Sequence, residues 1–228
     1  MWLSADDMMH ILRGGYDAKT LTADTMQYIV NQGQTTDRYR LEYENKQQLF
    51  RHSFMADYYL VDTQKHTRTR LSDVPVRDAQ LSPNGKYVVY AKADNNLYIY
   101  KIDFKTEVAL TTGDNTEIFN GISDWLYEEE FGVTRLFAFS PDSKLVAFVR
   151  LDETEVPTFD WQVFLGANYP KTESLRYPKA GEANAKATVC VYDIHYKTIR
   201  TMELPTNLDG YLPRITWTPL TKPTKKDA

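Results

Sequence analysis

The sequence has little or none of several features that mark particular classes of protein. It contains one cysteine, Cys190, in 228 residues, so no disulfide can form within the chain. No apolar run approaches the length of about 18 residues that a membrane-spanning helix needs. Residues 1–7 lack the basic start and apolar core of a secretory signal. The net charge of −4 comes without a basic cluster, which argues against a nucleic-acid partner.

Signatures of catalysis and metal binding are missing too. The four histidines, His10, His52, His66 and His195, lack the spacing of metal ligands, so we expect neither a metal nor another cofactor. For His52 we expect a packing or hydrogen-bonding role. No Gly-x-Ser-x-Gly pentapeptide occurs, so the nucleophile elbow of a serine hydrolase is absent. Cys190 lies in an apolar run, which favours a buried structural thiol over a reactive one.

What the sequence does contain is a high proportion of aromatic residues and a long repeat. Sixteen tyrosines, with Gly and Pro at intervals, favour an all-β fold. Segments 21–30, 81–90 and 139–148 align without gaps, and a fourth copy begins at Trp217. Each shows a strand end, a Ser/Thr-Pro/Ala-Asp/Asn turn and a second strand. Such units at a long fixed period predict a partial β-propeller of about three to four blades.

The last interval of the repeat is about 20 residues longer than the others. The excess coincides with residues 155–181, where two Tyr-Pro-Lys triplets occur and strand alternation is weak. We predict that this stretch projects from one blade as an arm. The partial propeller is expected to occupy residues 1–219, and residues 220–228 are expected to be a disordered or artificial tail.

The segment from Asp124 to Phe131 places three consecutive glutamates between a Trp/Tyr pair and a phenylalanine. Aromatic rings exclude water and carboxylates supply charge, so the segment predicts a cation site; the alternative is a solvated acidic turn. Because it lacks Gly and Pro, we expect a short helix capped by Asp124 or Ser123. Trp125 and Tyr127 are expected to pack the helix in place rather than to touch a ligand.

This segment resembles the double-glutamate motif of the dipeptidyl peptidase IV family. Arg-His-Ser-Phe-Met-Ala-Asp-Tyr at 51–58 resembles the arginine segment of the family. Asp-Glu-Thr-Glu-Val-Pro at 152–157 and Tyr-Pro-Lys-Ala-Gly at 177–181 resemble two further signatures. All four occur in family order, and the match spans roughly residues 15–217. The resemblance implies the N-terminal β-propeller of a serine exopeptidase that releases Xaa-Pro or Xaa-Ala dipeptides. It also implies that the C-terminal α/β-hydrolase domain, with its Ser-Asp-His triad, is absent from this chain.

The family resemblance assigns substrate binding to three residues. Glu129 and Glu130 would grip the free amino terminus of a peptide, whereas Glu128 would face away. Arg51 would contact a substrate carbonyl and be held by the acidic motif. In the family, the acidic motif lies on a helical insertion that reaches toward the hydrolase domain. An ammonium group has three donors, which two adjacent carboxylates can bracket and one cannot satisfy in a cavity. A mid-chain amide is neutral and would leave the carboxylates unpaired, so their distance from the nucleophile would act as a ruler.

Other expectations concern the arm and the complete protein. Asp152, Glu153 and Glu155 are expected to be structural, at a strand end and at the start of the arm. By resemblance, the arm contributes to a homodimer, the parent is periplasmic, secreted or on the cell surface, and this chain alone is inactive. Two alternatives remain open: the propeller of a prolyl tripeptidyl peptidase, and a non-catalytic propeller that binds peptides or proteins. The sequence after Glu130 is about one residue shorter than in the mammalian type of the family. Family roles of the residues just after the acids are therefore not assigned to this chain.

Overall fold

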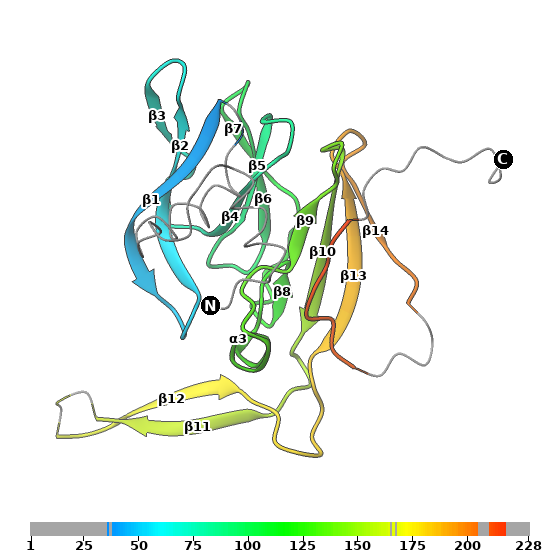
Figure 1. The fold of residues 1–228 in the computed structure, drawn as a ribbon. Coiled ribbons are helices and arrows are strands. Elements are labelled where there is room, and N and C mark those ends of the chain that lie inside the picture. Colours follow the sequence, from blue (N-terminus) through cyan, green and yellow to red (C-terminus); the bar gives the residue numbers. More distant parts are fainter. Residues whose placement is uncertain (1–35, 37, 165, 167, 205–209, 218–228) are drawn as a thin grey trace, which may run out of the picture.

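Three antiparallel sheets lie side by side and form the body of the molecule (Figure 1). The computed structural model describes residues 36, 38–164, 166, 168–204 and 210–217. Over these residues the chain is dominated by β-strands, and one short helix carries the glutamates. The predicted all-β partial propeller is therefore confirmed.

Each sheet is one blade of the propeller. The first blade has the strand order β1 (Tyr39–Gln48), β2 (Phe54–Asp62), β3 (Thr67–Arg70). The second has the order β4 (Arg77–Leu81), β5 (Tyr87–Ala91), β6 (Leu97–Lys101), β7 (Thr106–Ala109). In the third blade, both β8 (Ile118–Asn120) and β9 (Phe137–Phe139) pair with β10 (Leu145–Asp152). β10 also pairs with β13 (Lys186–Asp193), and β13 pairs with the edge strand β14 (Thr198–Thr201).

The Ser-Pro-Asx turns that open the second and third blades share one hydrogen-bond scheme. The hydroxyl of Ser82 accepts from the first N–H of β5, and the hydroxyl of Ser140 accepts from the first N–H of β10, each at 2.9 Å. Each turn contains a residue in the left-handed region, Gly85 with φ 67° and Ser143 with φ 59°. The repeats predicted at 81–90 and 139–148 are thus confirmed as strand–turn–strand units.

Turns of neighbouring blades contact one another. The N–H of Asn84 donates to the hydroxyl of Ser143 at 3.1 Å, which joins the second blade to the third. On the other side, Gly85 of the second blade lies close to Thr36 of the first: a Cβ added to Gly85 would be 3.4 Å from the Thr36 hydroxyl oxygen. Thr36 accepts from the N–H of Tyr39, the first residue of β1, as Ser82 does for β5. The described turn of the first blade is therefore at Thr36, and the repeat segment predicted at 21–30 lies outside the described residues.

Apolar cores between the blades hold the sheets together. In β5, Val88 and Tyr90 face the core shared with the first blade, while Val89 and Ala91 face the core shared with the third. Successive residues of a strand point to opposite faces, and all four side chains are fully buried because a core covers each face. Cys190 of β13 lies in the second core with 1% exposure, which confirms the predicted buried thiol.

The outer face of the third blade is covered by the chain that follows it. Val149 and Leu151 of β10 are buried there, and Leu212 and Ile215 pack against them. The indole N–H of Trp217 donates to a main-chain carbonyl oxygen of β9 at 3.0 Å. The residue predicted to open a fourth copy therefore lies against the third blade. The predicted tail, residues 220–228, lies outside the described residues.

A hairpin between β10 and β13 projects away from the three sheets (Figure 1). Its strands, β11 (Thr158–Val163) and β12 (Lys171–Arg176), pair in regular antiparallel register. The hairpin lies within the stretch 155–181 for which the sequence predicted an arm. Weak strand alternation did not prevent strand formation, because most residues of both strands are exposed and neither face needs an apolar stripe.

Candidate functional site

Helix α3 (Trp125–Phe131) carries the three glutamates and is inserted between β8 and β9 of the third blade. The carboxylate of Asp124 accepts a hydrogen bond from the N–H of Tyr127 at 2.8 Å and so caps the first turn. Gly132 ends the helix in the left-handed conformation, with φ 63°. The predicted short helix and its Asp124 cap are therefore confirmed.

Arg51 and Glu129 meet at the surface, although 78 positions separate them in the sequence. The Nε of Arg51 donates to both carboxylate oxygens of Glu129, at 2.8 and 3.1 Å. The arginine side chain is 69% exposed and the glutamate 19%, so the carboxylate is the more enclosed partner. No hydrogen bond among the described residues uses the terminal nitrogens Nη1 and Nη2 of Arg51. These donors therefore face no competition from the described residues when a ligand approaches.

Glu128 is buried and binds the segment that follows Arg51. Its Oε1 accepts from the main-chain N–H groups of His52 and Ser53, at 2.6 and 2.8 Å. Its side chain is fully buried; its Oε2 and the hydroxyl of Ser53 have no partner among the described residues. The expectation that Glu128 faces away from a ligand fits this burial. Its contact with the arginine segment was not expected.

Glu130 and His52 are both exposed. Within the described part of the chain, no ion pair or hydrogen bond holds the side chain of Glu130. The structure thus joins two of the three predicted binding residues, Arg51 and Glu129, and leaves the third carboxylate open to solvent at the next position. Of the packing and hydrogen-bonding roles expected for His52, the structure shows a hydrogen bond to α3, and the main-chain N–H makes it while the ring is exposed.

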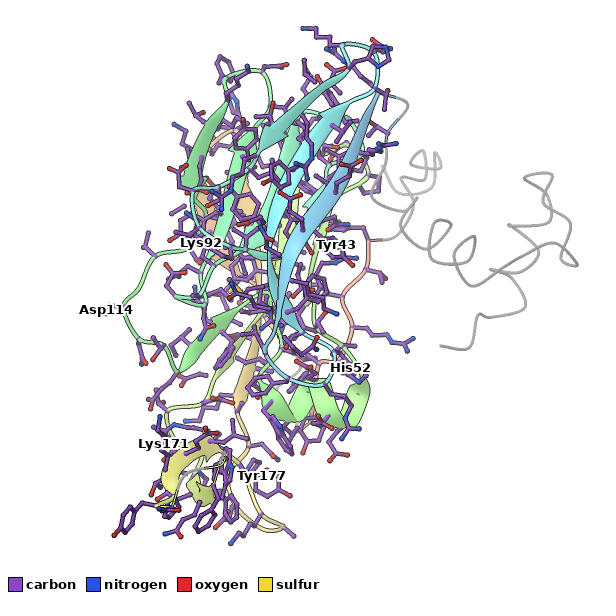
Figure 2. The ribbon with its side chains drawn as sticks, turned by 90° about the vertical axis from the view of Figure 1, so that its left-hand side faces the viewer. Tyr43, His52, Lys92, Asp114, Lys171 and Tyr177 are labelled. Carbon is purple, nitrogen blue, oxygen red and sulfur yellow. The ribbon has the colours of Figure 1, made fainter. Side chains whose placement is uncertain are left out.

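Aromatic contacts fix α3 on two further sides. The hydroxyl of Tyr127 accepts from the N–H of Leu212 at 3.0 Å, and its ring meets that of Tyr211 edge-on at 5.8 Å. Trp125 meets Tyr177 edge-on at 5.2 Å, which links the helix to the arm. In Figure 2, His52 lies beside α3 and Tyr177 lies near the arm. The prediction that Trp125 and Tyr127 pack the motif in place is confirmed.

Two buried carboxyl groups connect the start of α3 with the root of the arm. Asp124 and Glu153 are 3% and 7% exposed, and a hydrogen bond joins them. Burial raises the pKa of both groups, and for Glu153, with the charge of Asp124 adding to the effect, to about 8. Arg176 of β12 opposes the rise, whereas Glu117 adds to it. The pair therefore retains a proton near neutral pH.

The acids on either side of Glu153 have ordinary structural contacts. Asp152 is the last residue of β10, and its carboxylate accepts from the N–H of Thr154 at 3.0 Å. Glu155 forms an ion pair with Lys186 at 2.8 Å, with both side chains well exposed. These contacts agree with the predicted strand end and start of the arm.

Sequence reasoning missed one further charged residue near the site. Arg77 of β4 is buried and donates to the carboxylate of Asp78 at 2.9 Å. Its Nη2 also lies 3.4 Å from the hydroxyl of Ser123 and from the carbonyl oxygen of Thr134, which flank α3 on either side. The adjacent opposite charges of Arg77 and Asp78 at the start of β4 were the signal that could have revealed this support.

The part of the chain that the structure describes contains neither a cluster of metal ligands nor a membrane-spanning helix. There, no group of three or more His, Cys, Asp or Glu residues is arranged to hold a metal ion. No helix in these residues is long and apolar enough to cross a membrane.

Comparisons with known proteins identify the family. The family model described as the dipeptidyl peptidase IV (DPP IV) N-terminal region matches residues 34–225. The chain belongs to this family. A probable dipeptidyl peptidase 4 of Emericella nidulans is 32% identical over 196 residues, covering 82% of this chain and 25% of the relative. A probable dipeptidyl-aminopeptidase B of Talaromyces marneffei is 38% identical over 161 residues, covering 64% and 18%.

The structural comparison agrees with this family. The crystal structure of Porphyromonas gingivalis dipeptidyl peptidase 4 matches with a TM-score of 0.73 and 37% identity, covering 78% of this chain and 26% of that one. The chain thus spans about a fifth to a quarter of the dipeptidyl peptidases that it matches. It corresponds to an N-terminal region of the DPP IV family, and the named relatives are peptidases.

Proposed function

We propose that this chain is the substrate-recognition propeller of a serine-type dipeptidyl peptidase and that it binds the free amino terminus of a peptide. The observation that carries the proposal is the Arg51–Glu129 pair at the surface of α3, with Glu130 exposed at the next position. The complete protein would release Xaa-Pro or Xaa-Ala dipeptides with the triad of a C-terminal hydrolase domain. This chain alone would be inactive.

The charges of the site suit an ammonium group. The guanidinium of Arg51 offsets one of the two outer carboxylates, and the other leaves an excess negative charge. An ammonium bracketed by Glu129 and Glu130 would satisfy its donors and balance that charge. Because the Nε of Arg51 is already bound to Glu129, the orientation of its planar fork is set. The terminal nitrogens of the fork would then donate to a peptide carbonyl oxygen.

The same charges would reject a peptide that is not at its amino terminus. An internal residue presents a neutral amide, which cannot balance the acidic pair. Desolvating the carboxylates against such a peptide would leave them without a partner, and that cost disfavours binding. We therefore propose exopeptidase specificity that is set by charge.

We also propose that the arm is a contact surface of a homodimer. Phe159 and Trp161 stack on β11 with ring centroids 6.3 Å apart and remain 42% and 36% exposed. Phe164 and Tyr169 near the tip are 57% and 84% exposed. Exposed aromatic clusters are typical of interfaces, where such residues are enriched. The parent would lie in the periplasm, outside the cell or on its surface.

The binding proposal is tested in the complete protein with Glu129→Gln and Glu130→Gln. A bound peptide would desolvate its ammonium group and the carboxylates of the site, and removing one partner of such a charge pair costs about 2–5 kcal/mol. The kcat/KM for a Gly-Pro amide with a free amine should fall by roughly 30-fold or more. An N-acetylated substrate should already be poor and should lose little more. Glu203→Gln, an exposed glutamate after β14, is the matched control and should leave both substrates unchanged.

Other outcomes separate the alternatives. Equal losses for free and acetylated substrates would show that the acids support the fold and do not read the amino terminus. Release of tripeptides by the complete protein would indicate a tripeptidyl peptidase. Binding of peptides without any turnover would indicate a non-catalytic propeller.

A further inference from the structure

We propose that Glu128 is a positioning residue, which fixes the main chain next to Arg51 and thereby sets where the guanidinium stands against Glu129. The inference rests on the proposed function, since it concerns how the same site is held in shape. Glu128 would touch no substrate atom. It would act through the main chain of His52 and Ser53, which its carboxylate binds.

The turn that carries Arg51 has few other supports. It connects β1 with β2, and residues 49–52 are exposed, so apolar packing does not fix it. On the strand side, the N–H of Leu49 donates to the carbonyl oxygen of Ser53 at 3.0 Å, and the Gln48 amide donates to the same oxygen at 3.1 Å. These bonds close the turn but do not direct it toward α3. Glu128 supplies a direct link to the helix.

The ion pair of Arg51 and Glu129 cannot provide this orientation alone. The arginine side chain is 69% exposed, and exposed ion pairs contribute little because water screens them and two long side chains must be ordered. The contacts of Glu128 are of another kind. They are buried, charge-assisted and made to two successive main-chain N–H groups, so they restrain the backbone itself.

The arrangement of Glu128 is costly for the fold, which favours a role in the site. Its Oε2 and the nearby Ser53 hydroxyl are buried without a partner among the described residues. A buried carboxylate with incomplete hydrogen bonding is an inefficient way to stabilise a protein. The benefit it does provide is a fixed distance between α3 and the turn, so that Arg51 and Glu129 stay in register.

The proposal is tested in the complete protein by the ratio of kcat/KM for a free-amine Gly-Pro amide to that for its N-acetylated form. The ratio does not depend on the folded fraction of a variant, because both substrates meet the same sample. Glu128→Ala should lower the ratio by about 10-fold or more, since a displaced guanidinium no longer holds the Glu129 carboxylate in place against the substrate ammonium. Glu128→Gln keeps an acceptor oxygen and should restore the ratio to within about 3-fold of the parent.

A double-mutant cycle shows whether Glu128 acts through Arg51. In an Arg51→Ala background, Glu128→Ala should change the ratio by less than about 2-fold, because the positioned group is already gone. A second, undiminished loss in that background would overturn the proposal. So would a Glu128→Ala variant that melts at a lower temperature but keeps the parent ratio.

A measurement on the purified chain checks the contact without any activity. Hydrogen exchange of the His52 and Ser53 amides should accelerate in Glu128→Ala and remain slow in Glu128→Gln. Unchanged exchange in the alanine variant would count against the positioning role. If Glu129→Gln leaves the substrate ratio unchanged, the proposed function fails. If Glu129→Gln lowers the ratio and Glu128→Ala does not, the positioning role alone fails.

Discussion

Replacing Glu153 with glutamine should remove most of the pH dependence of stability between about pH 5 and pH 9. Glu153 shares a buried hydrogen bond with Asp124, at the junction of α3 and the arm. Above its pKa the site must hold two negative charges with little water. Arg176 nearby offsets part of this charge, and Glu117 adds to it. Glutamine keeps the shape and a donor for Asp124 but never becomes charged.

The magnitude follows from the pKa of about 8 for Glu153, against an ordinary value of 4.5. The folded state binds the proton more tightly than the unfolded chain, so the contribution is fully present below pH 4.5 and is lost as the pH rises through 8. At about 1.4 kcal/mol for each pH unit, the upper limit is roughly 5 kcal/mol. Relaxation around the new carboxylate reduces it, and we expect a loss of about 2–5 kcal/mol.

The assay is urea unfolding of the purified chain at a series of pH values. The parent should lose stability from pH 5 to pH 9, whereas Glu153→Gln should match it at pH 5 and exceed it at pH 9. Glu155→Gln, two positions along and exposed, is the control and should follow the parent curve. Parallel curves for the parent and Glu153→Gln would refute the reasoning.

Three further predictions concern other parts of the molecule. Gly121→Ala should destabilise the chain by about 2–4 kcal/mol in urea unfolding, because φ is +68° and the new Cβ would lie 2.7 Å from Leu97 Cδ1; Gly113→Ala has open space and should be neutral. Replacing Phe159 and Trp161 with serine should weaken dimerisation of the complete protein in sedimentation analysis, and an unchanged dimer would contradict the role of the arm. The purified chain should not hydrolyse a Gly-Pro chromogenic amide, and turnover that survives removal of contaminants would contradict the proposed division of roles.

Local chemistry explains why some features could be predicted from the sequence. The turns at Ser82 and Ser140 depend on serine hydroxyls that accept hydrogen bonds from main-chain N–H groups a few residues later, so the residue types alone predict these turns. The cap at Asp124 is local in the same way. The repeat alignment placed the first copy at 21–30, where Thr22-Ala23-Asp24 matches the turn pattern, and so did not assign the described first-blade turn at Thr36.

Long-range contacts explain what could not be predicted. Glu128 and its partner Ser53 are 75 positions apart, and nothing in a run of three glutamates shows which one turns inward. Asp124 and Glu153 would repel each other in water, so their hydrogen bond depends on the burial that the folded sheets impose. Family resemblance predicted that Arg51 lies against the acidic helix. It did not supply the buried contacts that hold them there.

The alternation of β5 has a consequence for how the chain unfolds. Val88 and Tyr90 belong to one core and Val89 and Ala91 to the other, so a single strand forms part of both. Melting the second blade would expose both cores at once, and the faces of the first and third blades that pack on it would become accessible to water. The blades should therefore lose structure in one transition rather than one after another, as coupling between adjacent repeats requires. Cooperativity in this fold would thus depend on a five-residue strand, Tyr87–Ala91, that lies far from the acidic helix in the sequence.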